Sequence, residues 1–235
     1  QKYPDIRGLM LVEHRRCGPE LIDYCNALVY GGRLDPVRES IPADQRIFPA
    51  FGYFAIASRD QKVGGSRKNM AEARAIVDWI VQNRALLERH YPDPKTGLSQ
   101  PIGKIVGIVT PFSPQAHLIA NLIKKKMPDT KKKGYAITVG TVHRLQGAER
   151  DVVLFSPTYG EDHKQGMFFD KGRNMMNVAV SRAKDSFLVF GNVSLFKPEK
   201  SGSPSGLLAK YLFKHKENDL ASAAKTGQSV AFTFI

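Results

Sequence analysis

Hydrophobic positions in the first half of the chain change between helical and strand spacing. Residues 20–30 and 70–90 carry apolar side chains at helical intervals. Asn69, followed three positions later by Glu72, forms a capping signal directly before the second of these segments. Residues 51–58 alternate between apolar and small or polar side chains, which predicts a strand between the two helices.

The second half of the chain alternates strands with helices. Short, almost wholly apolar runs are typical of strands covered on both faces, and they occupy 104–110, 136–142, 151–158 and 186–192. Helical spacing follows two of the turns between them, at 113–126 and 174–184. This order predicts an α/β fold with a mainly parallel sheet and helices on both faces. From residue 197 onward a Pro/Gly/Ser-rich stretch predicts a C-terminal tail with one short helix.

Three polar regions are expected near the ends of these strands. Ligands in open parallel sheets bind beyond the carboxyl ends of the strands, so we expect residues 110–115 and 141–151 at the same edge of the sheet. The third region, 177–184, reads as a helix. Arg182 and Lys184 are two positions apart there and cannot share one helical face, so we expect different roles for them.

The charge and cysteine content narrow the class of partner. A net charge of +13 with a pI near 9.8 favours a polyanionic partner, although a solubilising surface would have the same composition. Cys17 and Cys25 lie on one expected helix and fit neither a zinc site nor a disulfide framework, which favours a reducing, cytoplasmic setting. No apolar run approaches the roughly 20 residues that a membrane helix needs. The first residue is not Met, and we expect a fragment of a longer protein.

Several charged residues suit a triphosphate. Guanidinium groups match phosphate oxygens and a carboxylate can accept from ribose hydroxyls, as the Arg15-Arg16 pair, Arg182, Gln146 and Glu149 would allow. The chain nevertheless contains no G-x-x-x-x-G-K-[ST] motif and no strand that ends in two acidic residues able to hold magnesium. The sequence therefore predicts half of a phosphoryl-transfer site.

These polar regions carry a resemblance to superfamily 1 helicases. TVHRLQGAERDVVLFS resembles motif V, NVAVSRAKDSFLVFGN motif VI, and IVGIVTPFSPQ motif IV. HRRCGPELIDYCNALVYGGRL is similar to the motif usually written Q-Y-R-M-H-P, and SRKNMAEA also matches a pattern of this family. The matches span roughly residues 9–196. They are most similar to the branch typified by the nonsense-mediated decay helicase, whose members work on DNA or RNA.

The resemblance implies that residues 1–196 form the second RecA-like motor domain, a P-loop NTPase fold without its own Walker A motif, and that 197–235 form the tail. ATP with Mg would be sandwiched against the first RecA-like domain of the same polypeptide, which would hold the metal. Arg16 and Arg182 would be the catalytic arginines that stabilise charge on the γ-phosphate. Nucleotide binding would fall to Arg15 (which stands where the family has an adenine-stacking tyrosine), Gln146, Gly147 and Glu149. Single-stranded DNA or RNA would contact Thr110, Pro111, Phe112, Thr141, His143 and Arg144.

Three functions remain open at this point. The first is an ATP-dependent helicase or translocase, in which this chain is half of the motor and is inactive alone. The second is a catalytically inactive nucleic-acid-binding or regulatory module, against which the retention of Arg16, Glu149 and Arg182 argues. The third is an ATPase that remodels complexes without unwinding. Elsewhere, we expect Trp79 in the core, Arg150 and Asp151 in a turn or structural ion pair, and the lysine-rich run 124–133 in solvent.

Overall fold

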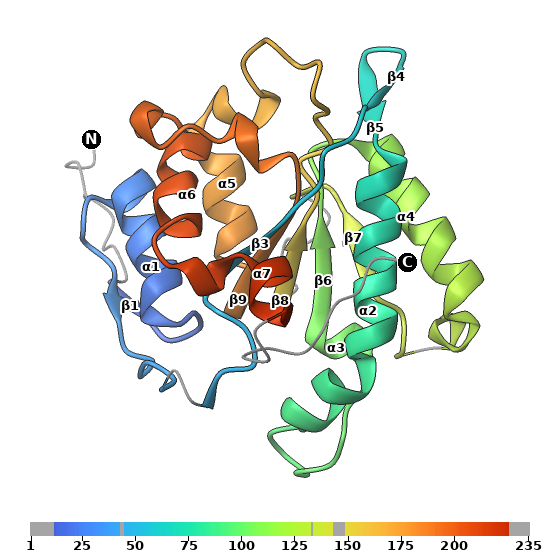
Figure 1. Cartoon of the computed structure of the whole chain (residues 1–235). Helices are drawn as coiled ribbons and strands as arrows, with labels where there is room; N and C mark the ends of the chain where they lie inside the picture. The colour runs from blue at the N-terminus through green and yellow to red at the C-terminus, as the bar shows by residue number, and fades with distance from the viewer. Residues whose placement is uncertain (1–11, 43–44, 133, 143–148, 226–235) are drawn as a thin grey trace, which may run out of the picture.

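A computed structural model describes residues 12–42, 45–132, 134–142 and 149–225 of the 235-residue chain (Figure 1). Within these residues, five strands form one sheet in which every neighbouring pair is parallel. Across the sheet the strands run in the order β3 (Phe51–Ala55), β9 (Ala183–Gly191), β8 (Arg150–Phe155), β6 (Val106–Val109) and β7 (Thr138–Gly140). The predicted α/β architecture with a mainly parallel sheet is confirmed.

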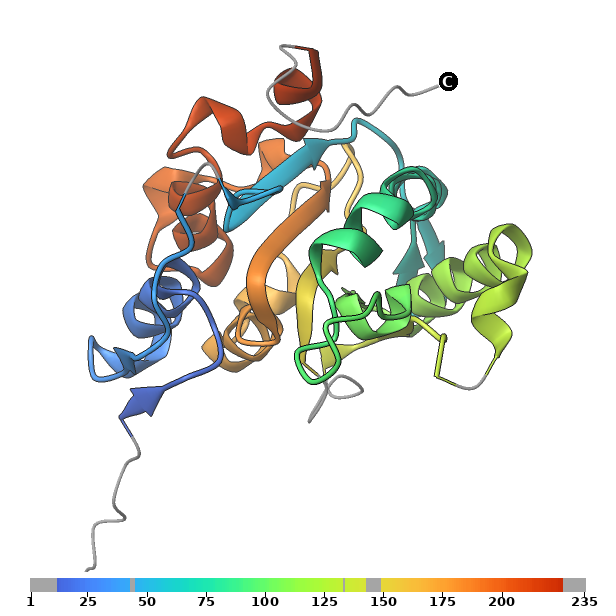
Figure 2. The same ribbon diagram turned by 90° about the horizontal axis from the view of Figure 1, so that it is seen from below.

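Helices cover both faces of this sheet, as predicted (Figure 2). One face carries α1 (Pro19–Cys25), which continues as a π-helix over Asn26–Tyr30, together with α5 (Arg173–Val180) and α6 (Pro204–Leu212). The other face carries α2 (Met70–His90), α3 (Ile102–Ile105) and α4 (Ser113–Lys126), while α7 (Leu220–Lys225) lies beside β3.

Two small strand pairs and several short turns complete the described structure. The strands β1 (Glu13–His14) and β2 (Asp35–Pro36) pair in parallel, and β4 (Gln61–Val63) and β5 (Ser66–Lys68) form a hairpin. Turns of 3-10 helix occupy Pro128–Lys131, Phe168–Asp170, Val193–Leu195, Pro198–Lys200 and Lys216–Asn218.

Local sequence signals account for the helix ends. The Asn69 side chain accepts a hydrogen bond from the backbone N–H of Glu72, which confirms the predicted cap of α2. Pro19 occupies the first turn of α1, where its missing N–H leaves no bond unmade. Gly31 ends the following π-helix with a φ of 60°, a conformation that glycine adopts without strain.

The helix expected over 174–184 is shorter than predicted. It ends at Val180, Arg182 lies in the turn that follows, and Lys184 belongs to β9. The backbone of this segment pairs with the start of β8 through the Arg150–Ala183 register, and the Lys184 carbonyl accepts from Gly18 N–H. Sheet pairing therefore overrides the helical spacing of the side chains, and Arg182 and Lys184 differ in role because they lie in different elements.

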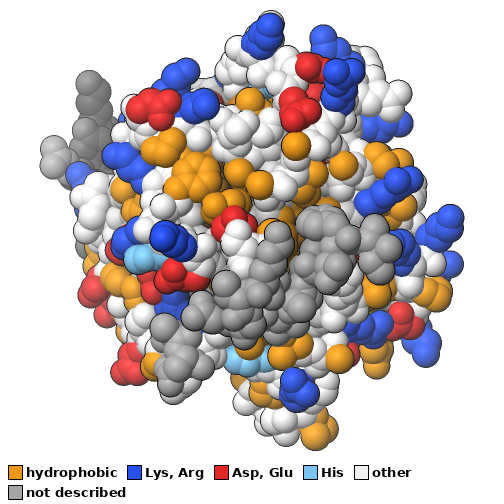
Figure 3. Space-filling view, viewed as in Figure 1, with side chains coloured by type: hydrophobic (Ala, Val, Ile, Leu, Met, Phe, Trp, Pro, Cys, Tyr) orange, Lys and Arg blue, Asp and Glu red, His pale blue; other side chains and the backbone are white. Residues whose placement is uncertain are grey.

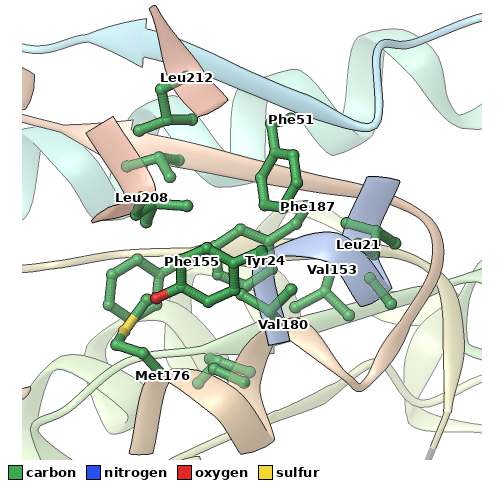
Figure 4. Packing of buried hydrophobic residues seen from close by; sticks show 14 of the residues in the cluster. Leu21, Tyr24, Phe51, Val153, Phe155, Met176, Val180, Phe187, Leu208 and Leu212 are labelled. Atoms are coloured by element: carbon green, nitrogen blue, oxygen red, sulfur yellow. The ribbon is translucent and has the colours of Figure 1, made fainter. Parts of the chain in front are cut away.

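The core is divided by the sheet into two apolar layers. Alternate side chains of β8 enter opposite layers: Val153 and Phe155 face α1, α5 and α6, whereas Val152 and Leu154 face α2, α3 and α4. Figure 4 shows the first layer, in which Tyr24, Phe51 and Phe187 pack with the leucines of α6. Trp79 is buried in the second layer, as predicted.

Helix α6 from the C-terminal region is part of the first layer. Leu208, Ala209 and Leu212 are fully buried in it. The N-terminal turn of α6 is also tied down by polar contacts, since Tyr24 Oη donates to the Pro204 carbonyl at 3.1 Å. Close packing continues at Gly206, where an added Cβ would lie 2.1 Å from the Lys200 carbonyl oxygen.

We expect Gly206→Ala to lower the free energy of unfolding by about 1–3 kcal/mol, because backbone atoms would have to move to admit the methyl group. This loss would occur although alanine is the better helix former by about 1 kcal/mol. Chemical denaturation measures it. Gly202→Ala is the matched control, since nothing lies within 4 Å of a Cβ built there. An unchanged midpoint for Gly206→Ala would mean that α6 is not held against Lys200 in solution.

Candidate functional site

Three charged residues from distant parts of the sequence meet at the amino end of the sheet. Arg16 Nε forms an ion pair with Glu149 Oε1, and each side chain is about one third exposed (35% and 34%). Arg182 enters the same region through its backbone, whose carbonyl accepts from the N–H of Arg150 at 3.0 Å. The structure therefore brings together both arginines expected to act in catalysis and the acid expected at the ribose.

A buried thiol lies among these charges. Cys17 Sγ donates to the Ser181 carbonyl at 3.5 Å, which fixes the segment before α1 against the turn after α5. Burial raises the pKa of Cys17 to about 12, while the nearby Arg16 and Arg182 act in the opposite direction and Glu149 reinforces the rise. The side chain is thus a neutral packing group rather than a nucleophile.

The guanidinium of Arg182 has an unused hydrogen-bonding atom. Its Nε is buried and, within the described part of the chain, has no hydrogen-bond partner. A buried donor without a partner is unfavourable by itself, and an acceptor satisfies it, most strongly when that acceptor is an anion. This orphaned donor beside Arg16 fits the phosphate end of a nucleotide. A carboxylate at Glu149 fits the hydroxyl-bearing end.

Arg38 anchors this cluster and was missed by the sequence analysis. Its guanidinium donates to the carbonyls of Arg16 at 3.2 Å and Lys184 at 2.9 Å, and it pairs with Asp185. These contacts join the loop before α1 to the first residues of β9. The loop 33–50 has no periodic pattern, so no sequence signal distinguished Arg38 from a surface arginine.

The Arg15 side chain has a different partner from that of Arg16. It pairs with Glu13 at 2.6 Å, and both side chains are mostly exposed. Arg150 and Asp151 lie in β8 rather than in a turn; Asp151 forms the expected kind of ion pair, with Lys184 at 3.7 Å, whereas Arg150 donates to the Gly103 carbonyl at 2.8 Å and to Thr138 Oγ1 at 3.0 Å. The lysine-rich run begins in the last turn of α4, where Lys126 pairs with Asp78 on α2.

Thr110, Pro111, Phe112 and Thr141, the described residues among those expected along the nucleic acid, lie at the carboxyl end of the sheet. The backbone N–H of Thr110, after β6, donates to the Gly140 carbonyl at the end of β7 at 3.1 Å, so Thr110 and Thr141 follow adjacent strand ends. Thr110 and Pro111 are buried, whereas Phe112 and Thr141 are partly exposed. His143, Arg144, Gln146 and Gly147 lie outside the described residues.

The expected position of the 141–151 region is correct only for its start. Thr141 follows β7 at the carboxyl end, but Glu149 precedes β8 at the amino end. Because β7 and β8 are both parallel to β6 and follow each other in sequence, the residues between them must return from one end of the sheet to the other. Arg182 likewise precedes β9. Arg16, Glu149 and Arg182 therefore lie at the opposite end of the sheet from the described nucleic-acid candidates.

A buried polar network supports the carboxyl end. Glu72, fully buried near the start of α2, accepts from Ser156 Oγ at 2.5 Å and from Thr158 N–H at 2.8 Å. Gln115 on α4 donates to Ser156 Oγ at 3.0 Å and to the Asn69 carbonyl at 3.0 Å. The network thus joins the first turns of α2 and α4 to the loop after β8.

Thr158 shows that this network holds the backbone in an unfavourable conformation. Its φ is 75°, which is costly for a β-branched residue, and persists only where surrounding contacts fix it. The Thr158 hydroxyl also lies 3.0 Å from that of Thr110. From its sequence position Glu72 is expected only to cap α2, and nothing in the sequence marks its partners Ser156 and Thr158.

Comparison with known proteins gives the family of this chain. The AAA_12 family model, described as an AAA domain, matches residues 2–194. The chain belongs to the AAA_12 family. This AAA_12 domain has a RecA-like fold and corresponds to the second motor domain of superfamily 1 helicases. The predicted resemblance to the branch of the nonsense-mediated decay helicase is confirmed.

Curated relatives of the domain are helicases. It is 26% identical over 209 residues to helicase mov-10-B.2 of Danio rerio, covering 81% of this chain and 20% of that protein. It is 32% identical over 192 residues to helicase sen1 of Schizosaccharomyces pombe, covering 78% and 11%, and 33% identical over 87 residues to ATP-dependent helicase upf1 of the same yeast, covering 37% and 9%. The chain thus spans about a fifth or less of these three relatives.

Among solved structures, the C-terminal domain of a "possible DNA helicase" from Lactobacillus plantarum is similar over 75% of this chain and 86% of its own, with a TM-score of 0.43 and 10% identity. That likeness is too low to add to the assignment, which rests on the family match and the helicase relatives. None of the helices described in the AAA_12 domain is long and apolar enough to cross a membrane. The described residues also contain no group of three or more His, Cys, Asp or Glu side chains placed to hold a metal ion.

The buried carboxyl of Glu72 predicts a pH dependence of stability. Burial raises the pKa of Glu72 from 4.5 to about 8, and outweighs the hydrogen bonds from Ser156 and Thr158, which lower it. The folded domain then keeps a proton that the unfolded chain has lost. The free energy of unfolding should therefore fall as the pH rises from 4.5 to 8 and level off above it.

Glu72→Gln should remove most of this slope, because the amide does not titrate. Relative to the variant, the wild type should lose about 3 kcal/mol between about pH 5 and about pH 8 in denaturation experiments. Glu161→Gln, on an exposed residue, is the control and should leave the slope of the wild type unchanged. Parallel pH profiles for wild type and Glu72→Gln would show that the carboxyl is ionised in the folded state.

Proposed function

We propose that this AAA_12 domain is the second motor domain of an ATP-dependent superfamily 1 helicase or translocase acting on single-stranded DNA or RNA. It would work with a first RecA-like domain of the same polypeptide. The observation that carries the proposal is that the described candidate nucleotide residues and the described candidate nucleic-acid residues lie at opposite ends of the sheet. Arg16, Glu149 and Arg182 gather at the amino end, and Phe112 and Thr141 flank the carboxyl end.

On the nucleotide side, the two arginines supply positive charge where the γ-phosphate develops negative charge. The Nε of Arg182, in the half-buried turn after α5, has no hydrogen-bond partner among the described residues and would be open to an anion. Arg16 would leave Glu149 for the phosphate, and Glu149 would then be free to accept from a ribose hydroxyl. Bound ATP with Mg supplies the reactive phosphoryl group, and the first motor domain would hold the metal.

On the nucleic-acid side, contacts would be independent of sequence. Thr110 and Pro111 are buried, so they support the loop, while the partly exposed Phe112 and Thr141 remain available to a strand. A net charge of +13 favours binding of any phosphate backbone. Sequence-independent contacts suit a motor that must step along any strand.

An inactive binding module of the same fold is the second candidate, and no observation favours it. A domain without turnover gains nothing from holding Arg16 and Arg182 near the same buried Cys17, since like charges brought together are unfavourable. Helicase relatives, among them the ATP-dependent upf1, support the active form. For the active motor we also propose the cytoplasmic location expected from the sequence.

In the two-domain motor, Arg182→Ala and Arg16→Ala should each lower kcat about 10³-fold or more with a smaller change in nucleotide affinity, because the charge they meet is largest in the transition state. Steady-state ATPase assays in the presence of single strand measure this. Arg89→Ala, on an exposed arginine at the end of α2, is the matched control. Near-normal kcat with a raised KM for either variant would assign that arginine to ground-state phosphate binding.

The 235-residue chain alone should hydrolyse no ATP, because it has neither the phosphate-binding loop nor its lysine, which supply most of the positioning in this chemistry. A phosphate-release assay on the purified chain, with and without single-stranded nucleic acid, measures this. Turnover that Arg182→Ala abolishes would place a complete active site within this chain and overturn its role as half of a motor.

A further inference from the structure

An aromatic side chain stands exposed in the loop between β8 and α5. Phe168 is 44% exposed, although phenylalanine is a residue type that is most often buried. It lies beside Phe112, with 6.2 Å between ring centroids and 36° between ring planes. Phe112 follows β6 at the carboxyl end, so Phe168 extends the end of the sheet assigned to the strand.

The backbone beneath Phe168 is held firmly although its ring is exposed. The Phe168 N–H donates to Tyr159 Oη at 2.7 Å, and the next residue, Phe169, is fully buried against Phe155 and Phe196. Asp170 then accepts from Ser205 N–H at 2.8 Å and Ser205 Oγ at 2.6 Å, which ties the loop to α6. The ring is therefore presented by a fixed support, and little conformational entropy is lost when a ligand covers it.

Positive charge accompanies the ring. Lys171 Nζ lies 5.9 Å from the centroid of Phe168, and both Lys171 and Arg173 are exposed. No ion pair involves either cation within the described residues. Figure 3 shows hydrophobic side chains exposed among Lys and Arg on the face seen in Figure 1.

We propose that Phe168 is a stacking platform for a base of the single strand, with Phe112 beside it and with Lys171 and Arg173 at the neighbouring phosphates. This inference rests on the proposed function and assigns a binding role to a loop outside the three polar regions. A fixed aromatic face next to unpaired cations fits single-stranded nucleic acid because every base has a face to stack, while a duplex keeps its bases covered. The contact would be independent of sequence.

The test measures binding of the 235-residue chain to a fluorescent single-stranded oligonucleotide by anisotropy. Phe168→Ala should weaken binding about tenfold, as loss of one stacked base does. Phe168→Trp should retain the affinity, and Phe168→Leu should behave like the alanine variant, because leucine keeps the apolar bulk and lacks the ring. Phe213→Ala is the matched control: this exposed phenylalanine, which packs on Tyr53 beyond the end of α6, should not affect binding.

A second arm separates stacking from charge. On an abasic strand of the same length, wild type and Phe168→Ala should bind equally, whereas Lys171→Ala should weaken binding to both strands. Equal affinities of wild type and Phe168→Ala for the base-bearing strand, or full affinity of Phe168→Leu, would overturn the stacking role while leaving the proposed function intact. Absence of any single-strand binding by the wild type would overturn the proposed function, and the platform with it.

Discussion

A parallel sheet whose two faces are both covered by helices leaves only its two ends for ligands. In this domain each central strand sends alternate side chains into two closed apolar layers, so polar chemistry on either face would disrupt the core. Every charged or polar group that the fold can devote to a ligand must therefore come from residues before or after the strands. Arg182 and Glu149 come before β9 and β8, and Phe112 and Thr141 come after β6 and β7.

The two ends are built by different means. At the amino end, backbone groups do much of the positioning: Arg38 holds the carbonyls on either side of the cluster, and Cys17 fills the space between. At the carboxyl end, a buried carboxyl group does it, through Glu72 and the strained Thr158. Backbone anchoring leaves side chains free to exchange partners, as proposed for Arg16 and Glu149 at the amino end. A fully satisfied buried network fixes a single conformation, which suits the fixed support proposed for the single strand at the carboxyl end.

The hydrophobic periodicity of the sequence predicted the helices whose limits depend on packing. It failed where hydrogen-bonded pairing between strands sets the limit of an element. The limits of α4 were predicted to the residue, because apolar spacing and flanking residues agree there. The end of α5 was not, because the residues after Val180 are drawn into β9 by pairing with β8. The placement of Glu149 failed for a related reason: β7 and β8 are both parallel to β6, so a residue directly before β8 lies at the opposite end of the sheet from the end of β7.

The site was likewise predictable only where a sequence motif marks it. Arg16 and Arg182 stand in recognisable sequence patterns, and the structure brings them together around Cys17. Arg38, Ser156 and Phe168 carry no such mark, because their importance lies in which distant residue each contacts. A single sequence contains spacing along the chain but not contacts across it, so residues of this kind appear only once the fold is known.

The Arg16–Glu149 ion pair has a consequence for how a motor cycle ends. In the role proposed for it, Arg16 would not face empty solvent when phosphate leaves, because Glu149 of the same domain could pair with it again. Glu149 would then compete with the product phosphate for Arg16, and release would become an exchange of partners rather than the exposure of a bare charge. Such an exchange favours fast resetting over tight holding, which a machine that must repeat its step requires.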